Sequence, residues 1–295
     1  TRVKNTSDFA LAGRSLPLPM VITATFATWF GSETILGLPG RFIESGIAGV
    51  IEEPFGSGMA LILVGTFFAH KLYKQNILTL GDYYRDRYGR SVELLCSVAI
   101  VISYLGWVGA QVTALGLVIN LITEGAVSMT TGMVIGAAVV LAYTMVGGMW
   151  SVAMTDFVQM IVIVVGLVAI LWFATDLAGG MDKVVDYARG RDLFHAFPEP
   201  TTTGWLFWIS AAMTMMIGSI PQQDVFQRVM SAKNLPTAVA GPILGGSFYI
   251  LFAFVPMFIV VAAILVMPDA AEKMLSEDPQ QLLPTLVRDY MPTVS

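Results

Sequence analysis

The sequence predicts an all-α, polytopic membrane protein. Of its 295 residues, 56% are hydrophobic and only 13% are charged, and the mean hydropathy is +0.73. A soluble domain carries about a quarter charged residues. The apolar residues gather in long uncharged runs, and no strand-like alternation of apolar and polar residues is seen. Because backbone groups in lipid must be hydrogen-bonded within their own segment, each run is expected to be a helix.

Seven hydrophobic segments are expected to cross the membrane. They are residues 18–40, 46–70, 92–122, 128–147, 151–175, 204–220 and 236–267. All but the short sixth segment are near or above the ~20 residues that a helix needs to span the hydrocarbon. With the N-terminus in the cytoplasm, ten Lys and Arg residues lie inside and six lie outside. This bias predicts a cytoplasmic N-terminus.

The composition excludes several classes of protein. The single cysteine, Cys96, rules out an internal disulfide framework, and two histidines far apart argue against a His-rich metal site. The net charge of −5 and the absence of a basic stripe argue against a nucleic-acid partner. GxGxxG, P-loop, GxSxG, HExxH and CxxC motifs are all absent, so we expect no enzyme. Because the chain starts in a polar stretch without Met, we expect it to be part of a longer protein.

The first segment combines apolar residues with a helix break. It contains TATFATWFGSETILGLPG, residues 23–40. Its glycines and Pro39 free backbone carbonyls from the helical ladder, and a desolvated Na⁺ is a partner for such oxygens. The alternative is a kinked helix whose freed groups bond to neighbouring spans. Glu33 lies near the membrane centre, where charged residues mark sites or pathways. Glu52 and Glu53 are interpreted as interfacial.

The sixth segment echoes the first. TWFGSE in the first and MMIGSIPQQ in the sixth both place Gly-Ser within the membrane, with Pro and polar groups close behind. The two segments run in opposite directions under the predicted topology. Paired interrupted helices of this kind point to a binding site at the midplane of the bilayer.

Further polar and aromatic residues are candidates for a site. Asp156 lies a few residues inside the fifth segment and shares a helix face with Gln159, so it is interpreted either as part of an inner ion vestibule or as a loop anchor. Gln222 and Gln223 are expected to line a cavity. Trp29 and Trp107 are candidates for a cation–π cage around an ammonium group, the alternative being an aromatic belt at the interface.

Five stretches together resemble the sodium:solute symporter family. They are SDFALAGRSLP (7–17), the Gly- and Glu-containing first segment, TLGDYYRDRYG (79–89), GGMWSVAMTDFVQ (147–159) and FQRVMSAKN (226–234). The resemblance implies a five-plus-five inverted-repeat fold, of which the seven segments are core helices 1–7. Residues 18–175 would form the first repeat, 176–203 an extracellular linker and 204–295 the start of the inverted second repeat.

The resemblance also implies roles for particular residues. The family's coupling Na⁺ is held in part by carbonyls at the break in core helix 1, which fall on Ala27 and Phe30. Asp156 matches the family's Asp on the inner Na⁺ route, while Glu33 and Thr34 fall where the family lines its substrate cavity.

The nature of the solute stays open. Gly218 and Ser219 stand at the Tyr-Trp pair of the sugar-transporting branch, which disfavours a sugar. FQR after the sixth segment and the ending LLPTLVRDYMP resemble the choline-transporter branch, but Gln222 stands where that branch has Trp.

We therefore expect Na⁺-coupled symport of a small polar organic solute across the plasma membrane by alternating access, without a required oligomer. The expected site residues are Trp29, Glu33, Thr34, Trp107 and Gln222 for the solute, and Ala27, Phe30 and Asp156 for sodium. The alternative is a transporter-like membrane sensor domain of a histidine kinase protein.

Overall fold

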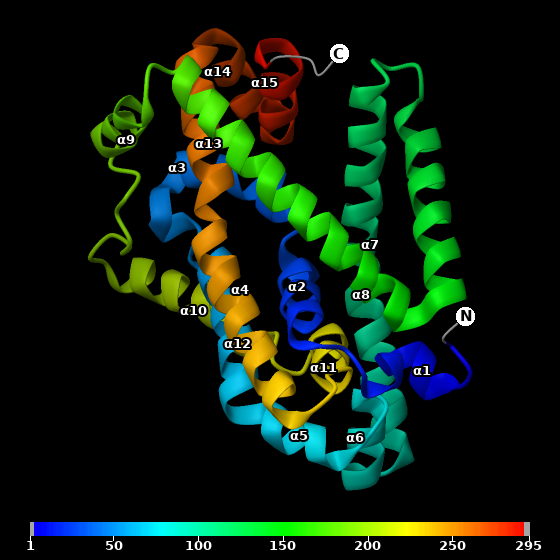
Figure 1. Ribbon diagram of the computed structural model, residues 1–295. Helices are drawn as coiled ribbons and strands as arrows, with labels where there is room; N and C mark the ends of the chain where they lie inside the picture. Colours follow the sequence, from blue (N-terminus) through cyan, green and yellow to red (C-terminus); the bar gives the residue numbers. More distant parts are fainter. Residues whose placement is uncertain (1–2, 292–295) are drawn as a thin grey trace. The chain divides into compact units, whose positions relative to one another are not determined.

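The computed structural model describes residues 3–291, and within them the fold is built of helices (Figure 1). The α-helices are α1 (Thr6–Leu11), α2 (Leu18–Trp29), α3 (Leu38–Gly49), α4 (Ser57–Leu63), α5 (Ala69–Gln75), α6 (Leu80–Tyr88), α7 (Arg90–Ile122), α8 (Met129–Leu177), α9 (Met181–Gly190), α10 (Thr202–Gly218), α11 (Gln223–Met230), α12 (Leu235–Phe252), α13 (Phe254–Val266), α14 (Pro268–Glu277) and α15 (Leu282–Tyr290). Shorter 3-10 or π turns are η1 (Ala12–Arg14), η2 (Glu33–Gly37), η3 (Ile51–Gly56), η4 (Val64–Phe68) and η5 (Pro279–Gln281).

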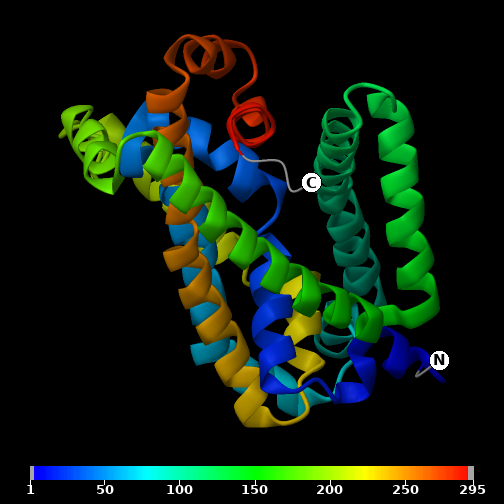
Figure 2. The ribbon, with the colours of Figure 1, turned by 45° about the horizontal axis from the view of Figure 1, so that its top comes forward.

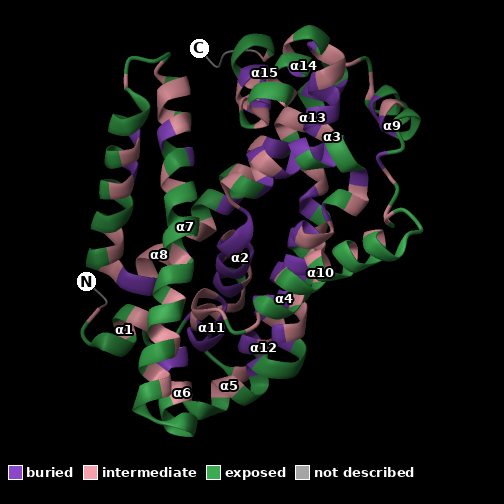
Figure 3. Ribbon diagram, turned by 180° about the vertical axis from the view of Figure 1, so that it is seen from behind, coloured by how far each residue is buried: buried purple, intermediate pink, exposed green. Residues whose placement is uncertain are grey.

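Four of the described helical stretches are long and apolar enough to cross a membrane. They are Ile51–Gln75, Arg90–Ile122, Met129–Leu177 and Leu235–Val266, and α10 and α11 together qualify as a fifth, broken span. Many large apolar side chains on these stretches face outward, as is expected of surfaces that contact lipid. On α7, for example, Leu95 is 70% exposed, and much of this helix is coloured as exposed in Figure 3. The predicted all-α class is confirmed.

The predicted fourth and fifth segments form one long helix, α8, with a break between them. Gly148 has φ +53° and ψ −148°, so the helical geometry stops there and then resumes. A Cβ on Gly148 would lie 2.5 Å from the Phe9 carbonyl oxygen, so only glycine fits this close approach of α1. The first part of α8 packs along α7, where Gly116 and Gly132 bring the backbones together (Figure 2).

The predicted first segment, 18–40, is also interrupted. The helix α2 ends at Trp29, and Glu33 begins a π turn that leads into α3. Pro39 stands in the first turn of α3, where its missing N–H removes no helical hydrogen bond. The second span starts at Ile51, later than the predicted residue 46, because the helical geometry is interrupted at Gly46, and the irregular turn η3 forms its first residues.

The described chain divides into two compact units. The first consists of residues 3–28, Leu61–Val158 and Ser219–Gly246, and the second of Trp29–Ala60, Gln159–Gly218 and residues 247–291. Each unit combines early and late parts of the chain. The predicted division into repeats at residues 175 and 204 stays a prediction.

In the first unit, α1, α6 and α11 share a hydrophobic cluster of Leu11, Leu80, Phe226 and Met230. Next to it, the Leu16 N–H donates to the Ser231 carbonyl oxygen, and the Lys233 N–H donates to the Leu16 carbonyl oxygen, both at 3.0 Å. These contacts join the start of the chain to the segment after α11.

In the second unit, α13 packs against α3, α9, α14 and α15, and η3 packs against α10. The predicted linker 176–203 contains the amphipathic helix α9 and is held to the end of α3. There, Ile47 N–H donates to the Leu193 carbonyl oxygen and Ala48 N–H to that of His195, both at 2.9 Å.

Candidate ion and solute site

The break in the first span lies between Trp29 and Glu33. In a continuous helix the Gly31 N–H would donate to Ala27, but it donates instead to the Trp29 carbonyl oxygen at 2.8 Å. The Ile35 N–H then donates to Gly31 at 3.1 Å. The helical ladder is thus interrupted where the glycine and proline pattern predicted a break. Whether the carbonyls of Ala27 and Phe30 hold Na⁺ stays a prediction.

The aromatic side chains at this break are buried. Trp29 is 8% exposed and Phe30 is 1% exposed. The Phe30 ring meets the Tyr249 ring edge to face, at 6.0 Å between centroids and 87° between planes, and it lies 5.4 Å from the Phe252 ring. Within the second unit, Phe30 therefore anchors the break against the end of α12.

Just after the break, a buried cluster of oxygen atoms joins three elements of the second unit. We call it the Glu53 cluster, and it consists of Thr34 on η2, Glu53 on η3, Tyr249 on α12 and the carbonyl oxygen of Trp29. Thr34 Oγ1 lies 2.8 Å from Glu53 Oε1, 3.0 Å from Tyr249 Oη and 3.0 Å from the Trp29 carbonyl oxygen. The Tyr249 hydroxyl is also hydrogen-bonded to Glu53 Oε1.

The Glu53 cluster contains two predicted site residues, Thr34 and Trp29, and two residues that were not predicted at a site, Glu53 and Tyr249. Thr34 and Tyr249 are fully buried, and Glu53 is 7% exposed. Glu53 had been interpreted as interfacial, and the structure instead buries it among hydroxyl groups. Its position directly before Pro54 in an apolar stretch was the available signal, since an irregular turn there redirects the side chain.

The other predicted carboxylate of this region, Glu33, lies outside the cluster. Its Oε1 is 3.9 Å from Arg41 Nη2, and the two side chains are 49% and 56% exposed. An exposed ion pair of this kind contributes only about 0–1 kcal/mol to stability. The structure therefore does not bring Glu33 together with the buried polar atoms of the Glu53 cluster.

In the first unit, Asp156 presents an unsatisfied oxygen. Its Oδ2 is buried and has no hydrogen-bond partner among residues 3–291. The neighbouring Thr155 hydroxyl donates instead to backbone oxygens of its own helix, at 3.1 Å to Ser151 and 2.8 Å to Val152. A buried carboxylate oxygen without a partner is costly unless something positive reaches it.

Also in the first unit, Trp107 and Gln222 lie near the start of α11. The Trp107 ring, 41% exposed, contacts the Tyr104 ring edge to face at 6.3 Å. The Tyr104 hydroxyl donates to Asp224 Oδ1 at 2.7 Å and accepts the Asp224 N–H at 3.2 Å. Gln222 precedes α11, and its side-chain amide donates to Ser219 Oγ at 3.4 Å.

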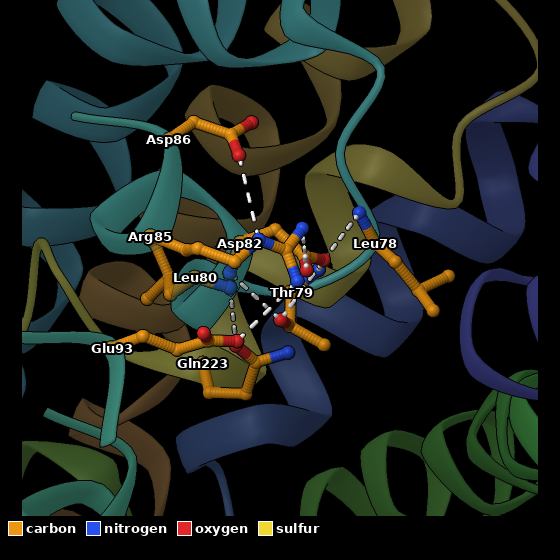
Figure 4. A network of polar contacts seen from close by, with 8 residues as sticks. All are labelled: Leu78, Thr79, Leu80, Asp82, Arg85, Asp86, Glu93 and Gln223. Atoms are coloured by element: carbon orange, nitrogen blue, oxygen red, sulfur yellow. Dashed lines mark hydrogen bonds and ion pairs between the residues drawn. The ribbon is translucent and has the colours of Figure 1, made fainter. Parts of the chain in front are cut away.

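The neighbouring Gln223 has a structural role. Its Oε1 accepts the Leu80 N–H at 2.9 Å and so ties α11 to the start of α6 (Figure 4). There, Thr79 and Asp82 form a capping box, in which the Asp82 N–H donates to Thr79 Oγ1 at 3.2 Å and the Thr79 N–H donates to Asp82 Oδ2 at 2.9 Å. Asp82 also pairs with Arg85 at 2.9 Å.

The charges around Arg85 strengthen this corner of the first unit. Arg85 lies 3.5 Å from Glu93 and 3.5 Å from Asp86, in addition to its pair with Asp82 (Figure 4). The negative charge of Glu93, followed by that of Asp82, raises the pKa of Arg85. The stretch 79–89, which carries part of the family resemblance, is therefore explained by helix capping and surface ion pairs.

Arg228 on α11 reaches the backbone of α2. Its Nε donates to the Ala24 carbonyl oxygen at 3.4 Å and its Nη1 to the Asp224 carbonyl oxygen at 3.2 Å. The side chain thus supplies donors to a helix turn that precedes the break.

Comparison with known proteins identifies relatives over most of the chain. The model of the sodium:solute symporter family matches residues 9–294. The high-affinity choline transporter 1 of Caenorhabditis elegans is 29% identical over 258 residues, which are 86% of this chain and 43% of that protein. The human high affinity choline transporter 1 is 30% identical over 231 residues, 76% of this chain and 38% of that protein. The sodium/glucose cotransporter 4 of Danio rerio is 28% identical over 276 residues, 86% of this chain and 41% of that protein.

A solved structure shares the fold. It is a Na⁺-coupled sialic acid symporter in a substrate-bound, outward-open state, with a TM-score of 0.79 and 17% identity over 97% of this chain and 60% of that chain. The chain spans about two fifths of the length of the curated relatives it matches. The predicted partial polytopic transporter fold is confirmed, and the chain is a multi-pass membrane protein.

Proposed function

Because the chain belongs to the sodium:solute symporter family, we propose that it is part of a protein that carries a small polar organic solute together with Na⁺ across the plasma membrane. The observation that carries this proposal is the interruption of the first span between Trp29 and Glu33 in a chain of that family. A break of this kind turns backbone oxygens away from the helix and makes them available to a cation. The proposal places the N-terminus of the chain in the cytoplasm.

For the sodium ion we propose the carbonyl oxygens of Ala27 and Phe30 and the carboxylate of Asp156. The Gly31 N–H donates to the Trp29 carbonyl oxygen in place of that of Ala27. This change in the backbone supports the proposed role of the carbonyl oxygens at the break. The buried Oδ2 of Asp156, which has no hydrogen-bond partner among residues 3–291, supports the proposed role of this carboxylate. A partly dehydrated cation would offset the cost of burying that oxygen. Oxygen ligands of these types suit a hard cation such as Na⁺.

For the solute we propose Trp29, Glu33, Thr34, Trp107 and Gln222. The relatives transport different solutes, as the names choline transporter and sodium/glucose cotransporter say of them. For this chain we propose only the class of the solute, which is a small polar organic molecule. Two conformations that open to opposite sides would alternate, and Na⁺ can drive the exchange only if it binds one of them more tightly.

A sodium-binding measurement tests the proposal without knowledge of the solute. The full-length protein is purified, and binding of ²²Na⁺ is measured with unlabelled Na⁺ or K⁺ as competitor. Asp156→Asn is expected to weaken binding at least tenfold, because the ion loses a charged ligand. Asp176→Asn is the matched control, since Asp176 lies exposed near the end of the same helix, and it should bind as the wild type does.

Equal displacement of ²²Na⁺ by K⁺ and Na⁺ would contradict the proposal, and so would unchanged binding in Asp156→Asn. Uptake by cells that express the full-length protein then addresses transport. Accumulation of choline, proline or glucose that does not depend on Na⁺ would count against symport.

A further inference from the structure

The Glu53 cluster contains more oxygen–oxygen contacts than its hydroxyl hydrogens can satisfy. Four contacts at hydrogen-bond distance join Thr34 Oγ1, Tyr249 Oη, Glu53 Oε1 and the Trp29 carbonyl oxygen. With an ionised Glu53, only the Thr34 and Tyr249 hydroxyls supply hydrogens, one each. Two of the four contacts would then bring two oxygen atoms together without a hydrogen between them. Repulsion between their lone pairs is unfavourable where no water can replace the missing hydrogen bond.

A proton on Glu53 halves this mismatch. Glu53 would donate to Tyr249, Tyr249 to Thr34, and Thr34 to the Trp29 carbonyl oxygen. Three hydrogens then serve three contacts in one continuous chain, and only the 2.8 Å contact between Thr34 and Glu53 is left without its own hydrogen. Successive hydrogen bonds of this kind polarise and strengthen one another.

The charges around Glu53 favour the same protonation state. Among residues 3–291, no Lys, Arg or His nitrogen lies within 4.0 Å of its carboxyl group, and Arg41 pairs with Glu33 instead, at 3.9 Å. An ionised Glu53 would therefore have no cation of its own to pair with.

The elements that pack against η3 supply no further compensating charge. The helix α10 carries no titratable side chain. On α3 the titratable groups are Arg41 and the exposed Glu44, on η3 itself there is Glu52, and on α12 there is Tyr249. An ionised carboxylate buried in a membrane protein without a cationic partner is costly, whereas a neutral, hydrogen-bonded carboxyl group is not.

We propose that the Glu53 cluster is a proton-binding site, in which the Glu53 carboxyl group is protonated at neutral pH and donates through Tyr249 and Thr34 to the Trp29 carbonyl oxygen. The site joins the break in the first span to the start of the second span and to α12. A movement of any one of these elements breaks the chain of hydrogen bonds and weakens proton binding. Protons therefore stabilise the conformation described here.

The consequence for transport rests on the proposed function, whereas the proton site itself does not. If the transport cycle opens the cluster, protonation of Glu53 must oppose that step, and alkaline conditions must promote it. Proton binding and conformation are linked reciprocally in this way, whatever the solute.

Infrared difference spectroscopy of the purified full-length protein tests the site directly. The carbonyl-stretch band of a protonated carboxylic acid is followed as the pH is raised from neutral to alkaline. The wild type should show a band at neutral pH that disappears on titration. Glu53→Gln should lack that band, and Glu44→Gln, which removes an exposed carboxyl group of the same unit, should retain it.

Two further variants keep the test decisive if Glu53→Gln does not fold. Tyr249→Phe and Thr34→Val each remove one hydroxyl partner and should shift the frequency of the band. A spectrum that is the same in the wild type and Glu53→Gln would overturn the proposal, as would a band that neither hydroxyl variant shifts. If the wild type shows no acid band and Glu53→Gln loses ²²Na⁺ binding, the cluster is instead a Na⁺ site, and the proton-site proposal is overturned.

The spectroscopic result is independent of symport. Absence of Na⁺-dependent uptake would refute the proposed function and leave the carboxylic acid band in place. Loss of the band with intact uptake would refute the proton site alone.

Discussion

Gly148, at the break inside α8, provides a sharp test of the packing of the first unit. Its backbone, with φ +53° and ψ −148°, lies in a region that residues with a Cβ rarely adopt. In Gly148→Ala, the added Cβ would lie 2.5 Å from the Phe9 carbonyl oxygen and 2.9 Å from the Phe9 Cα. Because both are backbone atoms, no side-chain rotation relieves the clash, and α1 must move.

The expected cost has two parts. Holding a non-glycine residue in such a backbone conformation costs about 1–3 kcal/mol. Forcing an extra carbon into a close contact adds about 1–3 kcal/mol. The free energy of unfolding should therefore fall by roughly 2–6 kcal/mol. At ~2–4 °C per kcal/mol for domains of 150–250 residues, the midpoint of thermal unfolding should fall by roughly 4–24 °C.

The assay is a heating series on the purified full-length protein, in which size-exclusion chromatography measures the fraction that stays monodisperse. Gly166→Ala is the control, because Gly166 lies in the same helix and nothing stands within 4 Å of its added Cβ. Alanine is favoured over glycine in a helix interior by about 1 kcal/mol, so the control should be at least as stable as the wild type. If Gly148→Ala unfolds at the same temperature as Gly166→Ala, the close approach of α1 is absent and the reasoning is refuted.

Two other substitutions test local features of the same unit. Thr79→Ala removes the oxygen that accepts the Asp82 N–H at 3.2 Å, so it should destabilise α6 by about 0.5–2 kcal/mol, and faster amide hydrogen exchange in the first turn of α6 would report it. Unchanged exchange there would contradict the capping box. Gly65→Ala would place a Cβ 2.8 Å from the Val239 carbonyl oxygen and should lower the thermal midpoint, while Gly106→Ala, with nothing within 4 Å of its Cβ, should not. Equal midpoints for these two variants would argue against close packing of α12 on the second span.

The helical segments and the break in the first span could be predicted because they depend on local sequence. Hydropathy over about twenty residues decides whether a segment can enter lipid. Glycine and proline act on the backbone of their own turn, so the interruptions near Gly31 and at Gly148 follow from the residues themselves. Local patterns failed at the segment edges, as at residues 46–50, where Gly46 adopts a positive φ beside Leu193 and His195.

The polar cluster around Glu53 could not be predicted from local patterns. Its members are separated by 19 residues between Thr34 and Glu53 and by 196 residues between Glu53 and Tyr249. Sequence position suggested Glu33 as the membrane carboxylate, because it stands in the middle of the first segment. The packing turned Glu33 outward to Arg41 and buried Glu53 instead.

The amino-acid order alone thus specified a membrane chain of apolar helices, its interrupted first span and its family. Those properties depend on transfer of short segments into lipid and on the conformational limits of single residues. Which acidic side chain is buried, and which hydroxyl groups surround it, was settled by the folded chain, because distant turns had to meet before any of those atoms could share a hydrogen.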